Sequence, residues 1–262
     1  MPRVPLADIV AYLDTYLRIA EVPDDRNAVN GLQVENGGAV GSIVAAVDAS
    51  QATIDGVAAA SDGEAPLLLV HHGLLWDGNV PIAGRRYRRL LALLEQDIAL
   101  YSAHIPLDVH PEVGNNVVLA ERLGISVEGW FGDYRGMPIG VWGDAPPRLA
   151  ARDSLLLEVN HVLGATATGS RLIPGGPDVV GRVGIITGGA GNMIASAREA
   201  GLDTFITGEG AHHTYFDAME WGINVLFAGH YATETLGVQA LASHLAERFE
   251  LEWEFHDHPT GL

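Results

Sequence analysis

Short apolar runs alternate with amphipathic stretches along this chain, which is the pattern of an α/β protein. Residues 6–22 carry apolar side chains at helical spacing and predict a helix. The apolar run at 42–48 predicts a strand, and residues 51–60 predict the helix that follows it. The runs at 67–70 and 98–103 predict two further strands of the same sheet. The first part of the chain therefore builds a sheet with helical connections.

The same rhythm returns after two turn-rich segments, residues 129–136 and 144–147. The remaining predicted elements are helices at 87–94, 115–123, 192–200, 212–221 and 232–249, and strands at 183–187, 204–207, 224–228 and 251–255. The shift in composition predicts a boundary near residue 128. It separates an N-terminal α/β lobe, residues 1–128, from a C-terminal α/β lobe, residues 129–262. The final helix and strand could pack back on the first lobe.

Composition removes several classes of chemistry. The chain has 262 residues and no cysteine, which excludes disulfides, thiolate nucleophiles and cysteine-type zinc sites. It also has no lysine, so Schiff-base chemistry on lysine and a Walker-type phosphate-binding lysine are excluded. No apolar run approaches the roughly 18 residues that span a bilayer, and the first residues lack the apolar region of a signal peptide. We therefore expect a cytoplasmic protein without a membrane partner.

The formal net charge of −18 comes from 33 acidic and 15 basic residues. Such a surface repels nucleic-acid backbones and anionic membranes, so direct nucleic-acid binding is disfavoured. The one dense basic cluster is the run of four arginines within residues 85–89. On a helix this run favours a solvated or ion-paired face, with phosphate binding or a subunit contact as the alternative.

Side chains that can bind metals stand where predicted strands end. In chain order they are His71, His72, His104, Asp108, His230 and Glu234. In an α/β fold the ends of the strands expose the working groups. Taken singly, each of these residues is more simply explained as a hydrogen-bonded loop or capping residue. Their coincidence at three strand ends favours a metal site.

The spacing of these residues limits how they can act. Adjacent residues on an extended strand point in opposite directions, so we expect His71 and His72 to chelate a single ion poorly and to serve two metals instead. His230 and Glu234 are four residues apart at the start of a predicted helix and share a face. Without thiolates the donors are nitrogen and oxygen, which suit Zn, Fe, Mn, Co or Ni.

Two further segments give weaker signals. Residues 187–192 connect a strand to a helix through glycines, but Ile194 occupies the last glycine position of a dinucleotide-binding fingerprint. A plain strand-to-helix turn is the favoured interpretation, with contact to an anionic ligand as the alternative. Residues 256–258, with the sequence His-Asp-His, have chelate-like spacing near the C-terminus, where a solvated tail is favoured.

Several longer motifs resemble the NIF-three-like family, the dinuclear-metal-centre proteins often labelled type 2 GTP cyclohydrolase I. The motifs, which run in the same order along nearly the whole chain, are Asn30-Gly31-Leu32-Gln33-Val34, residues 69–78, residues 103–116, Thr207-Gly208-Glu209 and residues 229–234. The length of the chain fits the short form of the family, without an inserted middle domain. Thr233 stands where many relatives have serine, a departure that should matter little.

The resemblance implies a fold of two intertwined α/β lobes with mostly parallel sheets and a metal site between them. By position, the metal ligands of the family correspond to His71, His72, Asp108, His230 and Glu234, with Glu234 as the bridging ligand. The histidines that line or approach the metal cavity, and could shuttle protons, correspond to His104, His212 and His213. The resemblance also implies two divalent metal ions per subunit and a ring-like homohexamer.

The function that follows from this resemblance is hydrolysis by water activated on two divalent metals, as in a GTP cyclohydrolase I type 2-like enzyme. For a small nucleotide such as GTP, hydroxide would add at C8 of the guanine and open the imidazole ring. The alternative is a non-catalytic metal-binding or regulatory interaction protein that forms a ring-shaped oligomer. A third hypothesis is that the histidine clusters close a structural metal site.

Overall fold

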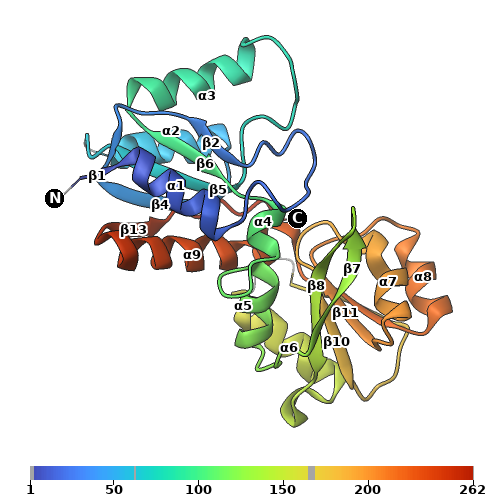
Figure 1. The fold of residues 1–262 in the computed structure, drawn as a ribbon. Coiled ribbons are helices and arrows are strands. Elements are labelled where there is room, and N and C mark those ends of the chain that lie inside the picture. The colour runs from blue at the N-terminus through green and yellow to red at the C-terminus, as the bar shows by residue number, and fades with distance from the viewer. Residues whose placement is uncertain (1–2, 62, 165–168, 262) are drawn as a thin grey trace. The chain divides into compact units, whose positions relative to one another are not determined.

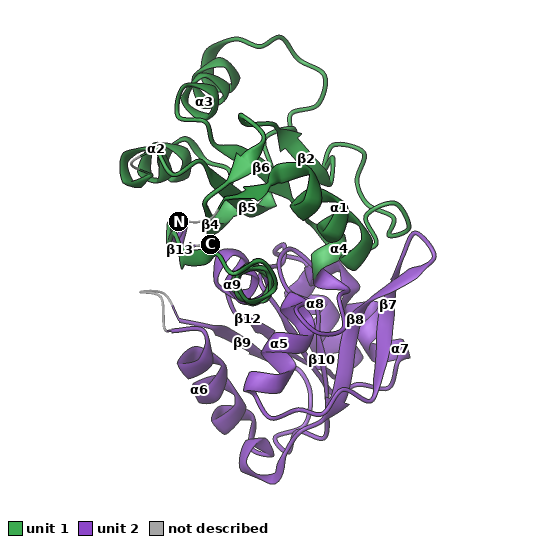
Figure 2. Cartoon of the chain, turned by 60° about the vertical axis from the view of Figure 1, so that its left-hand side comes forward, with its two compact units in different colours: residues 1–107, 238–258 green, residues 108–237, 259–262 purple. Residues whose placement is uncertain are grey.

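The structure, a computed structural model, describes residues 3–61, 63–164 and 169–261 and divides into two compact units. Unit 1 comprises Met1–Leu107 and Val238–His258, and unit 2 comprises Asp108–Gly237 and Pro259–Leu262 (Figure 2). The outermost residues of the two predicted lobes, 1–2 and 262, lie outside the described residues. Each unit has its own sheet, which confirms the α/β class predicted from the sequence.

The sheet of unit 1 has the strand order β13-β4-β5-β6-β2 (Figure 1). Its strands are β2 (Gly31–Val34), β4 (Ser42–Asp48), β5 (Pro66–His72), β6 (Ala99–Ser102) and β13 (Glu252–Phe255). The pairs β13–β4, β4–β5 and β5–β6 are parallel, and β2 joins β6 antiparallel. A small antiparallel pair, β1 (Val4–Pro5) and β3 (Ala39–Val40), lies outside this sheet.

The core of unit 1 follows from continuous apolar strands. Residues 67–70 of β5 are fully buried, as is typical of a parallel strand with helices on both faces. The helices associated with this unit are α1 (Leu6–Tyr16), α2 (Gln51–Ala60), α3 (Gly84–Glu95), α4 (Ile105–Asp108) and the C-terminal part of α9 (His230–Phe249). Ser50 caps α2 because its side chain accepts a hydrogen bond from the Thr53 backbone NH, at 3.1 Å.

The sheet of unit 2 is mixed, with the order β7-β8-β10-β11-β12-β9. Its strands are β7 (Gly129–Tyr134), β8 (Met137–Asp144), β9 (Arg171–Pro174), β10 (Arg182–Ile185), β11 (Thr204–Thr207) and β12 (Asn224–Phe227). Only the pairs β10–β11 and β11–β12 are parallel among these described strands, so the expectation of a mostly parallel sheet is wrong for unit 2. The β7–β8 hairpin explains part of the difference, because its turn residues Arg135 and Gly136 have φ angles of 55° and 88°.

Short helices connect the strands of unit 2. They are α5 (Asn115–Arg122), α6 (Arg152–Val162), α7 (Ile194–Glu199) and α8 (Thr214–Trp221), with 3-10 turns at Pro147–Leu149 and Gly191–Met193. Helix α5 packs against β8 and β10, which places it in unit 2 although it precedes the boundary expected near residue 128. The division therefore falls at Leu107/Asp108, where contacts change, and not where the turn-rich composition begins.

The chain returns to unit 1 at its end. Val238–His258 belongs to unit 1, and β13 pairs in parallel with β4. The last helix and strand thus complete the first sheet, an arrangement that the sequence left open. Helix α9 carries His230 in unit 2 at its start, and the unit boundary falls after Gly237 within the same helix.

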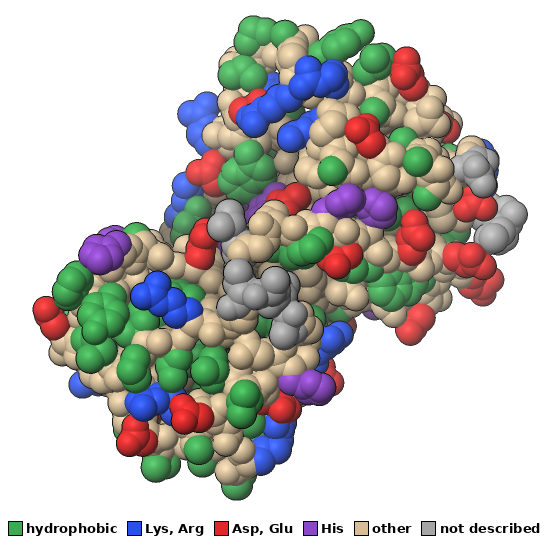
Figure 3. Space-filling model, turned by 180° about the vertical axis from the view of Figure 1, so that it is seen from behind, with side chains coloured by type: hydrophobic (Ala, Val, Ile, Leu, Met, Phe, Trp, Pro, Cys, Tyr) green, Lys and Arg blue, Asp and Glu red, His purple; other side chains and the backbone are tan. Residues whose placement is uncertain are grey.

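The arginine run lies on α3, and Figure 3 shows basic side chains gathered at the top of the molecule, where this helix lies. Arg86 is buried and bonds to the Asp77 carboxylate, to Val80 O at 3.1 Å and to Gly78 O at 2.7 Å. Arg85 lies 3.6 Å from the same carboxylate. Part of the cluster is therefore ion-paired and fixes the loop before α3. In the described part of the chain, no helix is long and apolar enough to cross a bilayer.

Candidate metal centre

Unit 1 presents two histidines at the carboxyl end of β5. The strand runs to His72, so both histidines are its last residues and do not lie in the loop beyond it. His71 is fully buried, and its Nδ1 donates to the carbonyl of Ala103 at 2.9 Å, just past the end of the neighbouring strand β6. His72 Nδ1 donates to Asp48 Oδ1 at 2.9 Å. In a neutral imidazole, a proton on Nδ1 leaves the lone pair that a metal needs on Nε2.

Asp48 was not identified as a site residue from the sequence. It is the last residue of β4, and the parallel register pairs it with His72. Parallel strands bring their carboxyl ends to one edge of the sheet, so a carboxylate on β4 reaches the ring on β5. Apolar character dominates β4 up to this aspartate, which is a signal in the sequence that could have been used.

His104 is held in the same way as His71 and His72. Its Nδ1 donates to Asp24 Oδ1 at 2.8 Å, and its backbone NH donates to Asn30 Oδ1 at 2.8 Å. Asp24 also accepts from Asn30 Nδ2 at 2.7 Å and from the Ile105 NH at 3.0 Å. Burial alone would raise the pKa of Asp24, but the hydrogen bond and charge of His104, with the bonds from Asn30 and the backbone, lower it. The carboxylate is thus ionised near neutral pH.

The three imidazoles of unit 1 converge. The ring centroids of His71 and His72 are 4.8 Å apart, and those of His71 and His104 are 5.0 Å apart. One possible ligand atom from each of the three histidines lies within 4.8 Å of the others. Two nitrogens on one ion, with bonds of about 2.1 Å, are separated by at most about 4.2 Å. The rings of His71 and His72 thus lie close together at the strand end, and the expectation that they serve two metals stays a prediction.

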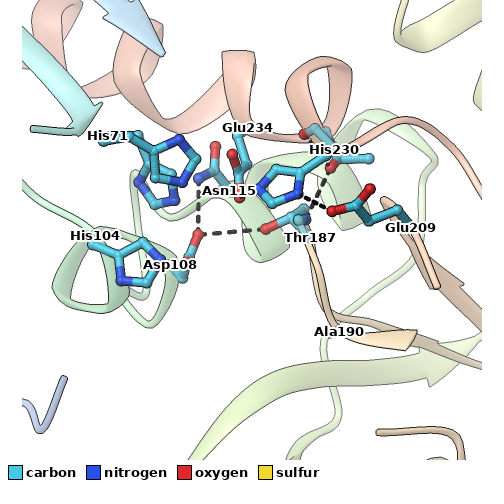
Figure 4. A network of polar contacts seen from close by, with 12 residues as sticks. His71, His104, Asp108, Asn115, Thr187, Ala190, Glu209, His230 and Glu234 are labelled. Carbon is cyan, nitrogen blue, oxygen red and sulfur yellow. Dashed lines mark hydrogen bonds and ion pairs between the residues drawn. The ribbon is translucent and has the colours of Figure 1, made fainter. Parts of the chain in front are cut away.

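Unit 2 holds Asp108 in a network of amides and hydroxyls. Asp108 Oδ1 accepts from Asn115 Nδ2 at 2.8 Å and from Thr187 Oγ1 at 3.4 Å (Figure 4). Asn115 is fully buried, and its Oδ1 in turn accepts from the Gly237 NH at 2.7 Å. Asn116 Nδ2 donates to the backbone carbonyl of Asp108 at 3.2 Å. The bonds from Asn115, in the first turn of α5, and from Thr187, after β10, fix the orientation of the carboxylate.

His230 and Glu234 face each other on the first turns of α9. His230 Nε2 lies 3.2 Å from Glu234 Oε1, as the i, i+4 spacing predicted, and His230 Nδ1 lies 2.8 Å from Glu209 Oε1. Burial would lower the pKa of His230, but the hydrogen bonds and charges of Glu234 and Glu209 raise it to about 9. Glu209 stands in a motif of the resemblance to which no role was assigned. In the structure it anchors His230 as Asp48 anchors His72.

The loop after β10 approaches Glu234 closely. Gly188 has φ of 68°, and a Cβ at this position would overlap Glu234 Oε1 and lie 3.3 Å from His230 Nε2. Gly188 NH donates to Thr233 Oγ1 at 3.0 Å, so the hydroxyl of Thr233 fixes the loop beside Glu234. Other amides of this loop are used internally: the Ala190 NH bonds to Thr207 Oγ1. The loop is therefore a strand-to-helix turn that is fixed by hydrogen bonds within the protein and packs against Glu234. This agrees with the favoured interpretation of residues 187–192.

The other histidines singled out from the sequence lie elsewhere. His212 and His213 are exposed directly before α8, where the ring of His212 packs edge-on against Phe216 at 5.7 Å. Their proposed role as proton shuttles stays a prediction. His256 and His258 are half-buried at the end of β13, with ring centroids 4.6 Å apart, and the His256 NH extends the ladder to Ala45 O at 2.8 Å. The solvated-tail interpretation is thus wrong for this segment.

The donor sets of both units fit divalent metals chemically. All four anchored imidazoles direct Nδ1 to a carbonyl or carboxylate, the arrangement that typically orients histidine ligands of metals. Carboxylates complete a nitrogen and oxygen set suited to late first-row ions.

A comparison with known sequences then decides the family: the profile described as Duf34/NIF3 (NGG1p interacting factor 3) matches residues 4–260.

The chain belongs to the DUF34/NIF3 family. It is 41% identical over 255 residues to a Deinococcus radiodurans protein named GTP cyclohydrolase 1 type 2 homolog, covering 97% of this chain and 94% of that protein. A Pseudomonas aeruginosa protein of the same name is 41% identical over 258 residues, with 98% of each covered. The family resemblance drawn from the motifs is thereby confirmed.

Solved structures of the NIF3 family share the fold. The protein ybgI, described as of unknown function, aligns with a TM-score of 0.89 and 37% identity, covering 99% of this chain and all of that one. TTHA1606 from Thermus thermophilus aligns with a TM-score of 0.86 and 40% identity, again over 99% of this chain and all of that one. The word homolog in the names of the sequence relatives assigns no measured activity to this NIF3 protein.

Proposed function

We propose that this NIF3 protein is a dinuclear metal-dependent hydrolase of the GTP cyclohydrolase I type 2-like kind. The observation that carries the proposal is a shared arrangement of the histidines: each is bonded through Nδ1 to a carbonyl or a carboxylate, which is how histidine ligands of metals are typically oriented. Histidines used only for packing have no reason to share this bond at Nδ1. Unit 1 supplies His71 and His72, and unit 2 supplies Asp108, His230 and Glu234.

The joint action of the two donor sets on one pair of ions rests on the family resemblance. When bound, two divalent ions would supply Lewis acidity that lowers the pKa of water and polarises the bond under attack. Their identity among Zn, Fe, Mn, Co and Ni is not fixed by this donor set.

The residues of the chain have separate tasks in this proposal. Asp48 and the Ala103 carbonyl orient His72 and His71, and Glu209 orients His230. Asn115 and Thr187 donate hydrogen bonds to Asp108 and fix the orientation of its carboxylate. His104, His212 and His213 are the candidates for moving a proton between substrate and water.

The substrate that we propose is a small molecule, in the first place a nucleotide such as GTP. The relatives named GTP cyclohydrolase 1 type 2 homolog support this choice. The homohexamer and the cytoplasmic location stay predictions.

The deciding experiment combines metal analysis with a hydrolysis screen of nucleotides and phosphodiesters on the wild type and on Glu234→Ala. The proposal predicts turnover that requires added divalent metal and is lost in the variant. Stable metal binding without metal-dependent turnover on any substrate would instead support a non-catalytic metal-binding or regulatory protein. An unchanged Glu234→Ala enzyme would remove Glu234 from the site.

A further inference from the structure

Arg89 on α3 is a half-buried arginine without a pairing partner in the part of the chain that the structure describes. Among those residues it makes no hydrogen bond, ion pair or ring contact, and its Nε is buried. Arg86 and Arg152 also have a buried Nε without a partner, but both bond through their terminal guanidinium nitrogens. Arg89 therefore differs from the arginines that fix the structure.

The positive charge around Arg89 is only partly balanced. Burial and the charge of Arg85 lower the pKa of Arg89, while the carboxylates of Asp77 and Asp48 oppose the shift. Asp77 already accepts a hydrogen bond from Arg86. A charged group that is partly buried and unpaired is costly, so the arginine run leaves a guanidinium for which an external anion would be a favourable partner.

Arg89 lies near the sheet edge that carries the histidines of unit 1. Asp48, whose charge acts on Arg89, is the last residue of β4 and accepts from His72 Nδ1 at 2.9 Å. Helix α3 follows the loop that leaves the end of β5, so its first turns start from the same edge of the sheet. An anion bound at Arg89 would therefore lie on the side of unit 1 that carries His71 and His72.

The chemistry of the arginine run suits a phosphate group. A guanidinium stays charged and offers two parallel N–H donors, which match the oxygens of a phosphate. The net charge of −18 repels anionic small molecules at a distance, so a nucleotide needs a local positive surface. Basic side chains gather where α3 lies (Figure 3).

We propose that Arg89 binds a phosphate group of the substrate, and that Arg85 and Arg88 raise the local positive potential around it. This inference rests on the proposed function for the identity of the substrate as a nucleotide. It adds a residue that selects phosphorylated over unphosphorylated substrates and is separate from the metal ligands.

The test measures binding to the full chain after treatment with a chelator, so that no divalent metal holds the phosphates. The probes are GTP, guanosine and inorganic pyrophosphate, followed by calorimetric titration. The wild type should bind GTP and pyrophosphate, and more weakly as the salt concentration rises. Arg89→Met keeps an apolar stem but loses the charge, so its affinity for both should fall by about 10- to 100-fold, with guanosine binding unchanged. Arg89→Lys should recover only part of the loss, because an ammonium group lacks the two parallel donors.

Two further variants serve as controls. Arg122→Met removes the same charge from an exposed position at the end of α5 and should match the wild type. Arg88→Met removes an exposed neighbour on α3 and should weaken pyrophosphate binding by less than about fivefold. If Arg89 only packs its stem against the protein, Arg89→Met should bind pyrophosphate as the wild type does.

This inference and the proposed function can fail separately. If the wild type binds neither GTP nor pyrophosphate, or if Arg89→Met binds both with unchanged affinity, this inference falls, and metal-dependent turnover of another substrate would leave the proposed function standing. Equal losses of guanosine and pyrophosphate binding in Arg89→Met would also overturn the inference, because Arg89 would then not act on the phosphate. If the metal-loaded wild type hydrolyses no substrate but pyrophosphate binding depends on Arg89, the phosphate site stands and the proposed function falls.

Discussion

Replacing Gly188 by alanine tests whether the close contact of this residue with Glu234 matters for metal binding, beyond the cost of backbone strain. Gly188 has φ of 68°, a left-handed conformation that costs alanine about 1 kcal/mol. For a protein of this size that corresponds to a fall in Tm of about 2–4 °C. The added Cβ would also overlap Glu234 Oε1, and the carboxylate would have to retreat by about 1 Å.

Gly222 supplies a matched control in the same unit. It too has φ of 68°, but the atom nearest to an added Cβ would be Gly175 O, at 3.9 Å. Gly222→Ala should therefore lose about 1 kcal/mol of stability and bind metal as the wild type does. Gly188→Ala should lose at least as much stability and, in addition, about 10- to 100-fold in metal affinity, measured by calorimetric titration with Zn²⁺ or Co²⁺. Equal metal affinities in the two variants would refute the claim that Gly188 leaves the space that Glu234 needs as a metal ligand.

Three further changes test other contacts. The pKa of His230 is about 9 in the folded protein against an ordinary 6.5, so protonation stabilises the metal-free fold by at most about 3 kcal/mol. This stabilisation is complete below pH 6.5 and is lost as the pH rises to about 9. Chemical denaturation across this range should show the fall in stability, and Glu209→Gln should make the dependence on pH weaker. Asn115→Asp places a second carboxylate against Asp108, so stability near pH 8 should fall by about 2 kcal/mol or more, with partial recovery in acid, and an unchanged pH profile would contradict the assigned bond. Arg86→Leu removes the hydrogen bonds from Arg86 to the loop before α3, so limited proteolysis should cut at residues 77–83 faster than in the wild type. Unchanged cleavage would show that the ion pair is dispensable.

Local periodicity was enough to predict most elements. The strand at 42–48, the helix at 51–60 and the strand at 204–207 agree with the structure to the residue. Buried strands and the helices that follow them can be predicted from the sequence, because burial requires apolar side chains at a fixed period. The β7–β8 hairpin, Gly129–Tyr134 and Met137–Asp144, was not predicted, because the glycines in residues 129–136 are typical of turns.

The candidate ligands could be named from the sequence, but their partners could not. Asp24 lies 80 residues from His104, and Asp48 lies 24 residues from His72. Such pairs meet only when strands align at one sheet edge or when a long loop folds back, and no local pattern encodes that. Glu209 had a usable signal, since it stands in the Thr207-Gly208-Glu209 motif.

We propose that Asp108 and Glu234, with the anchored histidines, hold two divalent ions that the reaction needs. The most direct measurement is metal content by elemental analysis on purified wild type and Asp108→Ala, with metal-dependent hydrolysis assayed on the same samples. The wild type should contain two ions per chain, and the variant should lose metal and turnover together. An Asp108→Ala protein that retains two ions per chain and hydrolyses substrate at the wild-type rate would contradict it.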